Sequence, residues 1–289
     1  MHHKNSITVL VIIIVVASII ATTTGILSND GPGIFEHKSI RGETVQIYGK
    51  GIYKHMSNDV AIQGIAQDYI TLFFAVPVLL ISLLFFRRGS LRGKFILTGS
   101  LLYILLTYLF YTAMATYNSL FLIYVILLST SLLAFILSII GFDVQKLKEM
   151  VRSEKIQTFS GWFVLFNSSM IALLWLKSIV TPLLSGALYP EGLDHYTTMI
   201  VQGFDLGIFL PMAFISGFLA VRKNTWGIVL TTVYVIFVSI LMSALTSKIL
   251  FMAKSGANVV PVVFIMPTIC VMSIILSVLL MMNIKKKII

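Results

Sequence analysis

The sequence predicts an all-α integral membrane protein, a polytopic bundle of about eight spanning helices. Apolar residues make up 58% of the chain and charged residues only 11%, whereas about a quarter of a soluble domain is charged. The apolar residues recur in runs of about 20, and at about 1.5 Å per residue such a run crosses roughly 30 Å of hydrocarbon. We therefore take the lipid bilayer as the chain's main solvent and partner.

The apolar runs define the expected spans in order. They lie at about 7–27, 67–86, 95–116, 119–141, 160–183, 199–221, 226–250 and 259–283. The first run follows a basic start, as a secretory signal does, but it is longer than an ordinary signal core, and ATTTGILSND offers no clear small-x-small cleavage site. We expect an uncleaved anchor; cleavage would leave seven spans.

The basic residues predict the orientation. The turns after spans two, four, six and eight read RRGSLRGK, FDVQKLKEMVRSEK, VRKN and IKKK, and with Lys4 they hold 14 of the 21 Lys and Arg. Cationic residues favour the cytoplasmic side, so both termini are expected in the cytoplasm and the protein in the plasma membrane. The net charge of +10 thus reflects topology and does not indicate a nucleic-acid partner.

Two loops carry a local pattern. The external segment 28–66 contains TVQIYGKGIY, in which alternating runs flank residues 49–51, and this predicts a small hairpin. We expect a packed loop capping the outer mouth of the bundle, with partner binding as the alternative. On the inner side, Val144, Leu147 and Val151 recur at helical spacing among basic residues, which predicts a short helix on the anionic leaflet.

The second and sixth spans suggest an internal duplication. IQGIAQDYITLFFAVPVLLISLLFFRRG and IVQGFDLGIFLPMAFISGFLAVRKN both place Gln and Gly before an acid, then a proline, then basic residues. Two parallel four-helix repeats, 1–158 and 159–289, would place a site between the halves of one membrane domain. The spacing differs, because Asp68 precedes Pro77 by nine residues and Asp205 precedes Pro211 by six.

Ionisable residues inside apolar spans are costly and are therefore candidate functional residues. Four qualify: Asp68, Lys177, Asp205 and Lys248. Counted from the basic turns, all four lie about 25 to 33 Å away, near the outer boundary. With Gln202 and with His195 of the loop LYPEGLDHY, they could line an outward-facing polar site for a small solute or ion. In the alternative interpretation the lysines extend to the headgroups and the aspartates cap helix N-termini.

Other kinds of site find no support in the sequence. Gly203 and Gly207 flank Asp205 at a small-xxx-small spacing, which favours helix packing, and GFDLG is not the Gly-x-Gly-Asp element of intramembrane aspartyl proteases. The five histidines lie outside the spans, and Cys270 is the one cysteine. We predict no catalytic residue, metal or cofactor, and find no nucleotide-binding loop.

The segments YGKGIY, QDYITL, RRGSLRGK and YNSLFLIYV occur between Tyr48 and Ile136. This stretch resembles a group of uncharacterised bacterial and archaeal polytopic membrane proteins, and VQGFDLGIFLP looks like their later Asp-containing span. The resemblance implies the fold and topology and assigns no functional residue.

The preferred interpretation is a transporter or permease-like bundle with an outward-facing polar site. One alternative is a membrane scaffold or sensor that uses the external segment and the basic turns. Another is an envelope enzyme acting on lipid-linked substrates, with Asp68, Asp205 or His195 as acid or base. The absence of a soluble catalytic domain makes the enzyme the less favoured choice.

Overall fold

The computed structural model describes residues 3–114, 116–187, 189–190 and 192–285. It contains eight helical segments long and apolar enough to cross a membrane, so the predicted all-α membrane bundle is confirmed. Their bounds are Lys4–Leu27 (α1), Asn58–Arg87 (α2, η2 and α3), Leu91–Met114 (α4), Phe121–Ile140 (α5), Glu154–Ser185 (α7), Ile200–Val221 (α8, η3 and α9), Thr225–Lys254 (α10) and Val262–Asn283 (α11).

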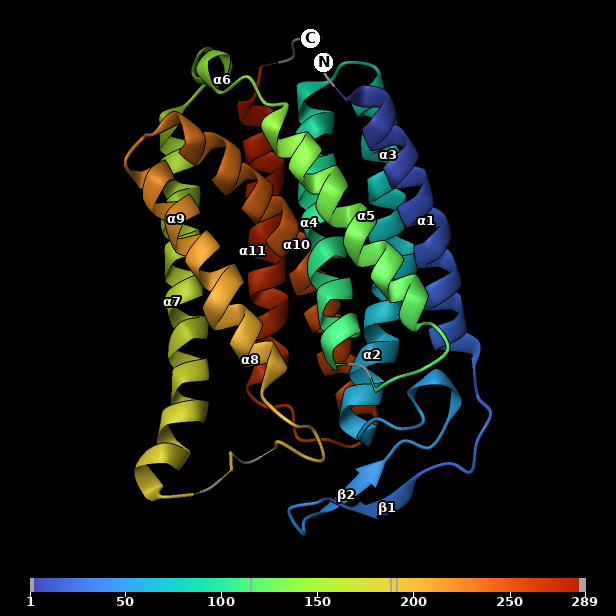
Figure 1. Ribbon diagram of the computed structural model, residues 1–289. Coiled ribbons are helices and arrows are strands. Elements are labelled where there is room, and N and C mark those ends of the chain that lie inside the picture. The colour runs from blue at the N-terminus through green and yellow to red at the C-terminus, as the bar shows by residue number, and fades with distance from the viewer. Residues whose placement is uncertain (1–2, 115, 188, 191, 286–289) are drawn as a thin grey trace.

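The helix pair α4 and α10 forms the centre of the bundle (Figure 1). Of the apolar windows of these helices, 67% and 78% are buried within the protein, against 17% for α7 and for α11. A Cβ atom on Gly99 of α4 would lie 2.5 Å from the side chain of Ile236 on α10. The missing side chain therefore lets the two central helices approach closely.

The second span begins about nine residues before its predicted start, at Asn58. Its first turns, NDVAIQGIAQD, are too polar to be recognised from hydropathy, yet they are helical and pack against α1 and α10. These helices bury Gln67 and Asp68, each 3% exposed, whereas Asp59 in the first turn stays exposed. Asp68 is consequently an interior helical residue.

Two spans contain a π-helical turn at matching positions. The turn η2 covers Thr71–Ala75 between α2 (Asn58–Ile70) and α3 (Val76–Arg87). The turn η3 covers Asp205–Phe209 between α8 (Ile200–Phe204) and α9 (Leu210–Val221). Residue 205 minus residue 71 gives an offset of 134, and the same offset relates Pro77 to Pro211, each in the first turn of the helix that follows.

The turns that follow these spans repeat at the same offset. In the turn after α3, the amide of residue 88 donates to the carbonyl of residue 84, that of 89 to 86 and that of 90 to 85. In the turn after α9, the same three bonds recur, from 222 to 218, from 223 to 220 and from 224 to 219. In this register Asp205 stands where the first half has Thr71, so the two aspartates are not counterparts. The matching pieces favour parallel repeats, whose limits 1–158 and 159–289 stay a prediction.

The external hairpin forms with a different partner strand from the one predicted. Strand β2 (Thr44–Ile47) pairs antiparallel with the preceding strand β1 (Phe35–Lys38), whereas the segment after Gly49 forms a short 3-10 helix, η1 (Gly51–Tyr53). Gly49 and Gly51 both have positive φ, and this conformation turns the chain away from β2.

The predicted inner helix is present as α6 (Val144–Met150). Leu147 is only 3% exposed and packs into the core, so α6 is attached to the bundle and does not merely rest on the leaflet. The start of α1 and the end of α11 lie at this end of the bundle, opposite β1 and β2 (Figure 1).

We predict that Gly227→Ala destabilises the protein and that Gly203→Ala does not. A Cβ atom on Gly227 would lie 2.4 Å from the backbone of Leu219 and Ala220, so α9 and α10 must separate, at a cost of about 1 to 3 kcal/mol. Nothing lies within 4 Å of a Cβ atom on Gly203 or Gly207, so the predicted close packing at these two glycines is wrong. Thermal unfolding in detergent measures the unfolding midpoint of both variants. Equal midpoints for Gly227→Ala and Gly203→Ala would contradict the close packing of α9 against α10 at Gly227.

Candidate functional site

The carboxyl group of Asp68 is enclosed near the end of the bundle that carries β1 and β2 (Figure 1). Asp68 lies on α2 and is 3% exposed. The hydroxyl of Tyr53, from η1, donates to Oδ2 at 2.5 Å, and the hydroxyl of Tyr111, from α4, lies 3.1 Å from Oδ1. The external segment thus closes over this carboxyl, which does not line an open vestibule in this conformation.

The hydroxyl groups around Asp68 have too few hydrogens for their contacts. The Tyr111 hydroxyl also lies 3.0 Å from the carbonyl oxygen of Gly64 and 3.2 Å from the Tyr53 hydroxyl. Each phenol supplies one hydrogen, so two hydrogens serve four close contacts. Burial and the neighbouring Asp68 carboxylate raise the pKa of Tyr53 well above its ordinary value, so Tyr53 remains a donor. A proton on Asp68 would supply a third hydrogen.

Buried hydroxyl groups continue this cluster toward α5. The ring of Tyr111 lies 5.7 Å from that of Tyr108 and 5.3 Å from that of Tyr124. The hydroxyls of Tyr108 and Tyr124, and that of Ser18 on α1, are buried without a hydrogen-bond partner among the described residues. Buried polar atoms of this kind commonly bind ordered water.

Gly25 of α1 makes room for the Asp68 carboxyl. A Cβ atom on Gly25 would lie 1.9 Å from Oδ2 of Asp68 and 3.0 Å from the Tyr53 hydroxyl. Any side chain here would occupy the space that the carboxyl fills. The glycine therefore allows α1 to pass directly over the acid.

Lys248 on α10 links Asp68 with the second aspartate. Its ammonium interacts electrostatically with both Asp68 and Asp205. Neither pair comes within 4.0 Å, since the ion pairs among the described residues are confined to Asp143 with Lys146 and Glu154 with Lys223. The carboxylate of Asp205 also accepts a hydrogen bond of 2.8 Å from the indole of Trp175 on α7.

The charges at this site do not balance. Two ionised carboxylates and one ammonium give a net charge of −1 in a mostly apolar surrounding. Such a group is stabilised by one bound proton or one monovalent cation. The arrangement is therefore chemically suited to reversible binding of a single positive charge.

The remaining predicted residues lie around or outside this group. Gln202 precedes Asp205 by one helical turn and is half-buried. In the external loop, Nε2 of His195 lies 3.0 Å from the carbonyl oxygen of His55. Lys177 is exposed on α7 and makes no hydrogen bond or ion pair with any residue that the structure describes, so the interpretation that it extends to the headgroups fits this residue.

The alternative that the aspartates cap helix N-termini is wrong. Helix α2 has its N-cap at Ser57 and α8 at Met199, so both aspartates lie inside helical segments. The prediction started the second span too late, at residue 67, because the polar turns before Asp68 do not look like membrane helix. The predicted start of the sixth span, at 199, agrees with α8.

The external segments form a closed cap. The guanidinium of Arg41 donates to the carbonyls of Asp194 and Tyr196, and the amide of Ser57 donates to the hydroxyl of Tyr196 at 3.2 Å. The segment 28–57 is thereby joined to the loop before α8. This arrangement favours the predicted packed loop and holds Tyr53 over Asp68.

Sequence reasoning missed the roles of Tyr53, Trp175 and Gly25. Tyr53 lies outside the spans, and its partner is 15 residues away on another element. The sequence signal was the GKGIY turn, whose glycines bend the chain back toward the bundle, but no periodicity indicates what the tyrosine meets.

We predict that Gly25→Ala disrupts the site and that Asp68→Ala rescues it. The new methyl group overlaps Oδ2, so the single Gly25→Ala variant should lose about 2 kcal/mol or more of stability. Removing the carboxyl frees that space, so Gly25→Ala should cost little in an Asp68→Ala background. A cost that is the same in both backgrounds would show that the carboxyl does not occupy this position.

Comparison with protein-family models, with curated proteins and with solved structures gives no match to this chain. The geometry of the site is therefore the basis for inferring its function.

Proposed function

We propose that this chain is a plasma-membrane transporter of the permease type, in which a proton bound at the Asp68 and Asp205 site is exchanged as a small solute or ion crosses. One observation carries the proposal. Asp68 and Asp205, on two different spans, both interact electrostatically with Lys248 on the central helix α10. Intramembrane acids with a shared counter-charge are typical of proton relays in carriers.

The spans that carry these acids contain features that allow movement. One π turn starts at Asp205 and the other starts three residues after Asp68, and each is followed by a proline, Pro211 or Pro77. Such interruptions occur often at functional sites and are places where helices bend. Gain or loss of a proton would change the attraction between Lys248 and both spans, which supports coupling between protonation and helix position.

The proposed orientation places the external cap outside and the basic turns in the cytoplasm, with both termini. The basic turns and α6 lie at the end opposite the cap (Figure 1), and the rule that cationic turns stay inside supports this direction. The closed cap then corresponds to a state in which the acid site is shut from the outside.

The enzyme and scaffold alternatives have less support. An enzyme using Asp68 needs a substrate-accessible carboxyl, whereas this one is enclosed by Tyr53 and Tyr111. A scaffold that binds partners through the segment 28–66 needs a free loop, whereas this loop is joined to the loop before α8.

The test is proton flux in liposomes that contain the purified protein and an internal pH-sensitive dye. Amino acids, sugars, organic cations and inorganic ions are offered in turn under an imposed pH gradient. The wild-type protein should give a solute-dependent pH change, and Asp68→Asn and Asp205→Asn should reduce it at least about tenfold, since each removes a protonatable group.

The matched control is Lys177→Gln, which changes an exposed membrane lysine outside the site and should retain wild-type flux. The size-exclusion profile of each variant reports folding separately. Wild-type flux and folding in Asp205→Asn would remove Asp205 from the mechanism. Flux equal to that of protein-free liposomes across the whole panel would contradict the transporter proposal.

A further inference from the structure

A second polar site lies at the opposite end of the bundle. A cavity of about 680 Å³ opens between the turn from α3 to α4, the end of α5, and α6. Its walls include the apolar side chains of Phe142, Leu147 and Met150, together with Ser90 and Lys94. A cavity of this size accommodates a small molecule.

Lys94 is a buried cation in the wall of this cavity. It is 8% exposed, and its ammonium lies 4.1 Å from the centroid of the Phe142 ring. The ammonium makes no hydrogen bond or ion pair with the residues that the structure describes. A buried charge without an opposite charge is costly, and a single aromatic contact offsets only part of that cost.

The other charged groups on the cavity leave Lys94 unneutralised. Asp143 pairs with Lys146 at 2.8 Å and also caps α6 by accepting from the amide of that lysine. Glu149 is exposed to solvent, and no ion pair joins it to a described residue. His3 completes the titratable lining. The cavity therefore contains one buried positive charge that forms no ion pair with a described carboxylate.

The start of helix α4 adds to the positive character of this cavity. Ser90 precedes the helix, and its Oγ accepts from the amide of Gly93 at 3.1 Å. Helix α4 runs for 24 residues from Leu91, and the positive end of its dipole faces the cavity wall formed by Ser90 and Leu91. Helix N-termini of this kind bind phosphate and carboxylate groups.

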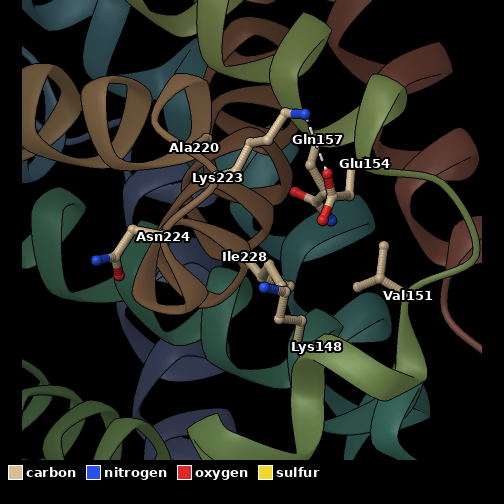
Figure 2. A pocket seen from close by; sticks show the side chains of 8 residues that line it. All are labelled: Lys148, Val151, Glu154, Gln157, Ala220, Lys223, Asn224 and Ile228. Carbon is tan, nitrogen blue, oxygen red and sulfur yellow. Dashed lines mark ion pairs between the residues drawn. The ribbon is translucent and has the colours of Figure 1, made fainter.

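The second half of the protein shows that the fold does not require this lysine. At the offset of 134 residues, Ile228 stands at the position of Lys94. The equivalent pocket, lined by Ile228 and Asn224 (Figure 2), holds only about 20 Å³, and beside it Lys223 is paired with Glu154 at 3.2 Å. The large cavity and its unpaired cation are thus specific to the first half.

We propose that this cavity binds a phosphate ester, with the phosphate beside Lys94 and the start of α4 and the apolar part of the ligand against Phe142 and Leu147. The two sources of this chemistry are an anionic phospholipid of the inner leaflet and a water-soluble phosphate. The apolar walls and the position among basic turns suit both.

The test is thermal unfolding of the purified protein in neutral detergent, followed by tryptophan fluorescence. The probes are short-chain phosphatidylglycerol, short-chain phosphatidylcholine and inorganic phosphate, each at matched ionic strength. Phosphatidylglycerol should raise the unfolding midpoint by about 3 °C or more, because a ligand that binds only the folded state stabilises it. Phosphatidylcholine, which has no net charge, should raise it less. An equal rise with inorganic phosphate would identify the soluble source, and no rise with inorganic phosphate would identify the lipid.

The variants locate the effect. Lys94→Ile introduces the residue found at the equivalent position, Ile228, and should abolish the ligand-induced shift. The ligand-free midpoint should stay the same or rise, since a buried unpaired charge has been removed. Lys94→Gln serves the same purpose if the isoleucine variant does not fold. Lys148→Gln, which removes an exposed lysine of α6 that does not line the cavity, should keep the shift. No shift with any probe, or a full shift in both Lys94 variants, would overturn the proposal.

Discussion

The arrangement of the end of the bundle beside β1 and β2 depends on one constraint, the burial of the Asp68 carboxyl. A carboxyl at 3% exposure needs hydrogen bonds and a counter-charge. Tyr53, Tyr111 and Lys248 provide these from the cap, α4 and α10. The requirement explains why α1 has a glycine where it crosses the acid and why the external segment folds back onto the bundle.

The two spans with π turns show how one backbone pattern can carry different side-chain chemistry. Both have a π turn, a proline and a tight basic turn at one constant offset. The polar groups do not follow this offset, because Asp205 occupies the position of Thr71 and Ile228 that of Lys94. As a result Asp68 and Asp205 lie at different positions along their spans, and both interact with Lys248 on the central helix.

Much of the fold follows from the sequence, because a membrane helix must present about 20 apolar residues and its flanking turns can be basic. The depth of Asp68 followed from counting along its helix. The polar start of α2 was missed because protein, not lipid, covers it. The contact of Tyr53 with Asp68, the hydrogen bond from Trp175 to Asp205 and the pairing of β2 with β1 depend on tertiary approach, which hydropathy does not contain. The register of the two halves became visible only in the backbone hydrogen bonds of the turns.

The most direct test of the shared charge site is a double-mutant cycle on the free energy of unfolding, using Asp68→Asn, Lys248→Met and the double variant. If the ammonium stabilises the carboxylate, the two changes should be non-additive by about 1 kcal/mol or more. A cycle between Lys177→Met and Asp68→Asn provides the reference, because Lys177 lies outside the site. Additivity within about 0.5 kcal/mol for Asp68 and Lys248 would contradict a shared site and, with it, the proposed coupling between the two halves.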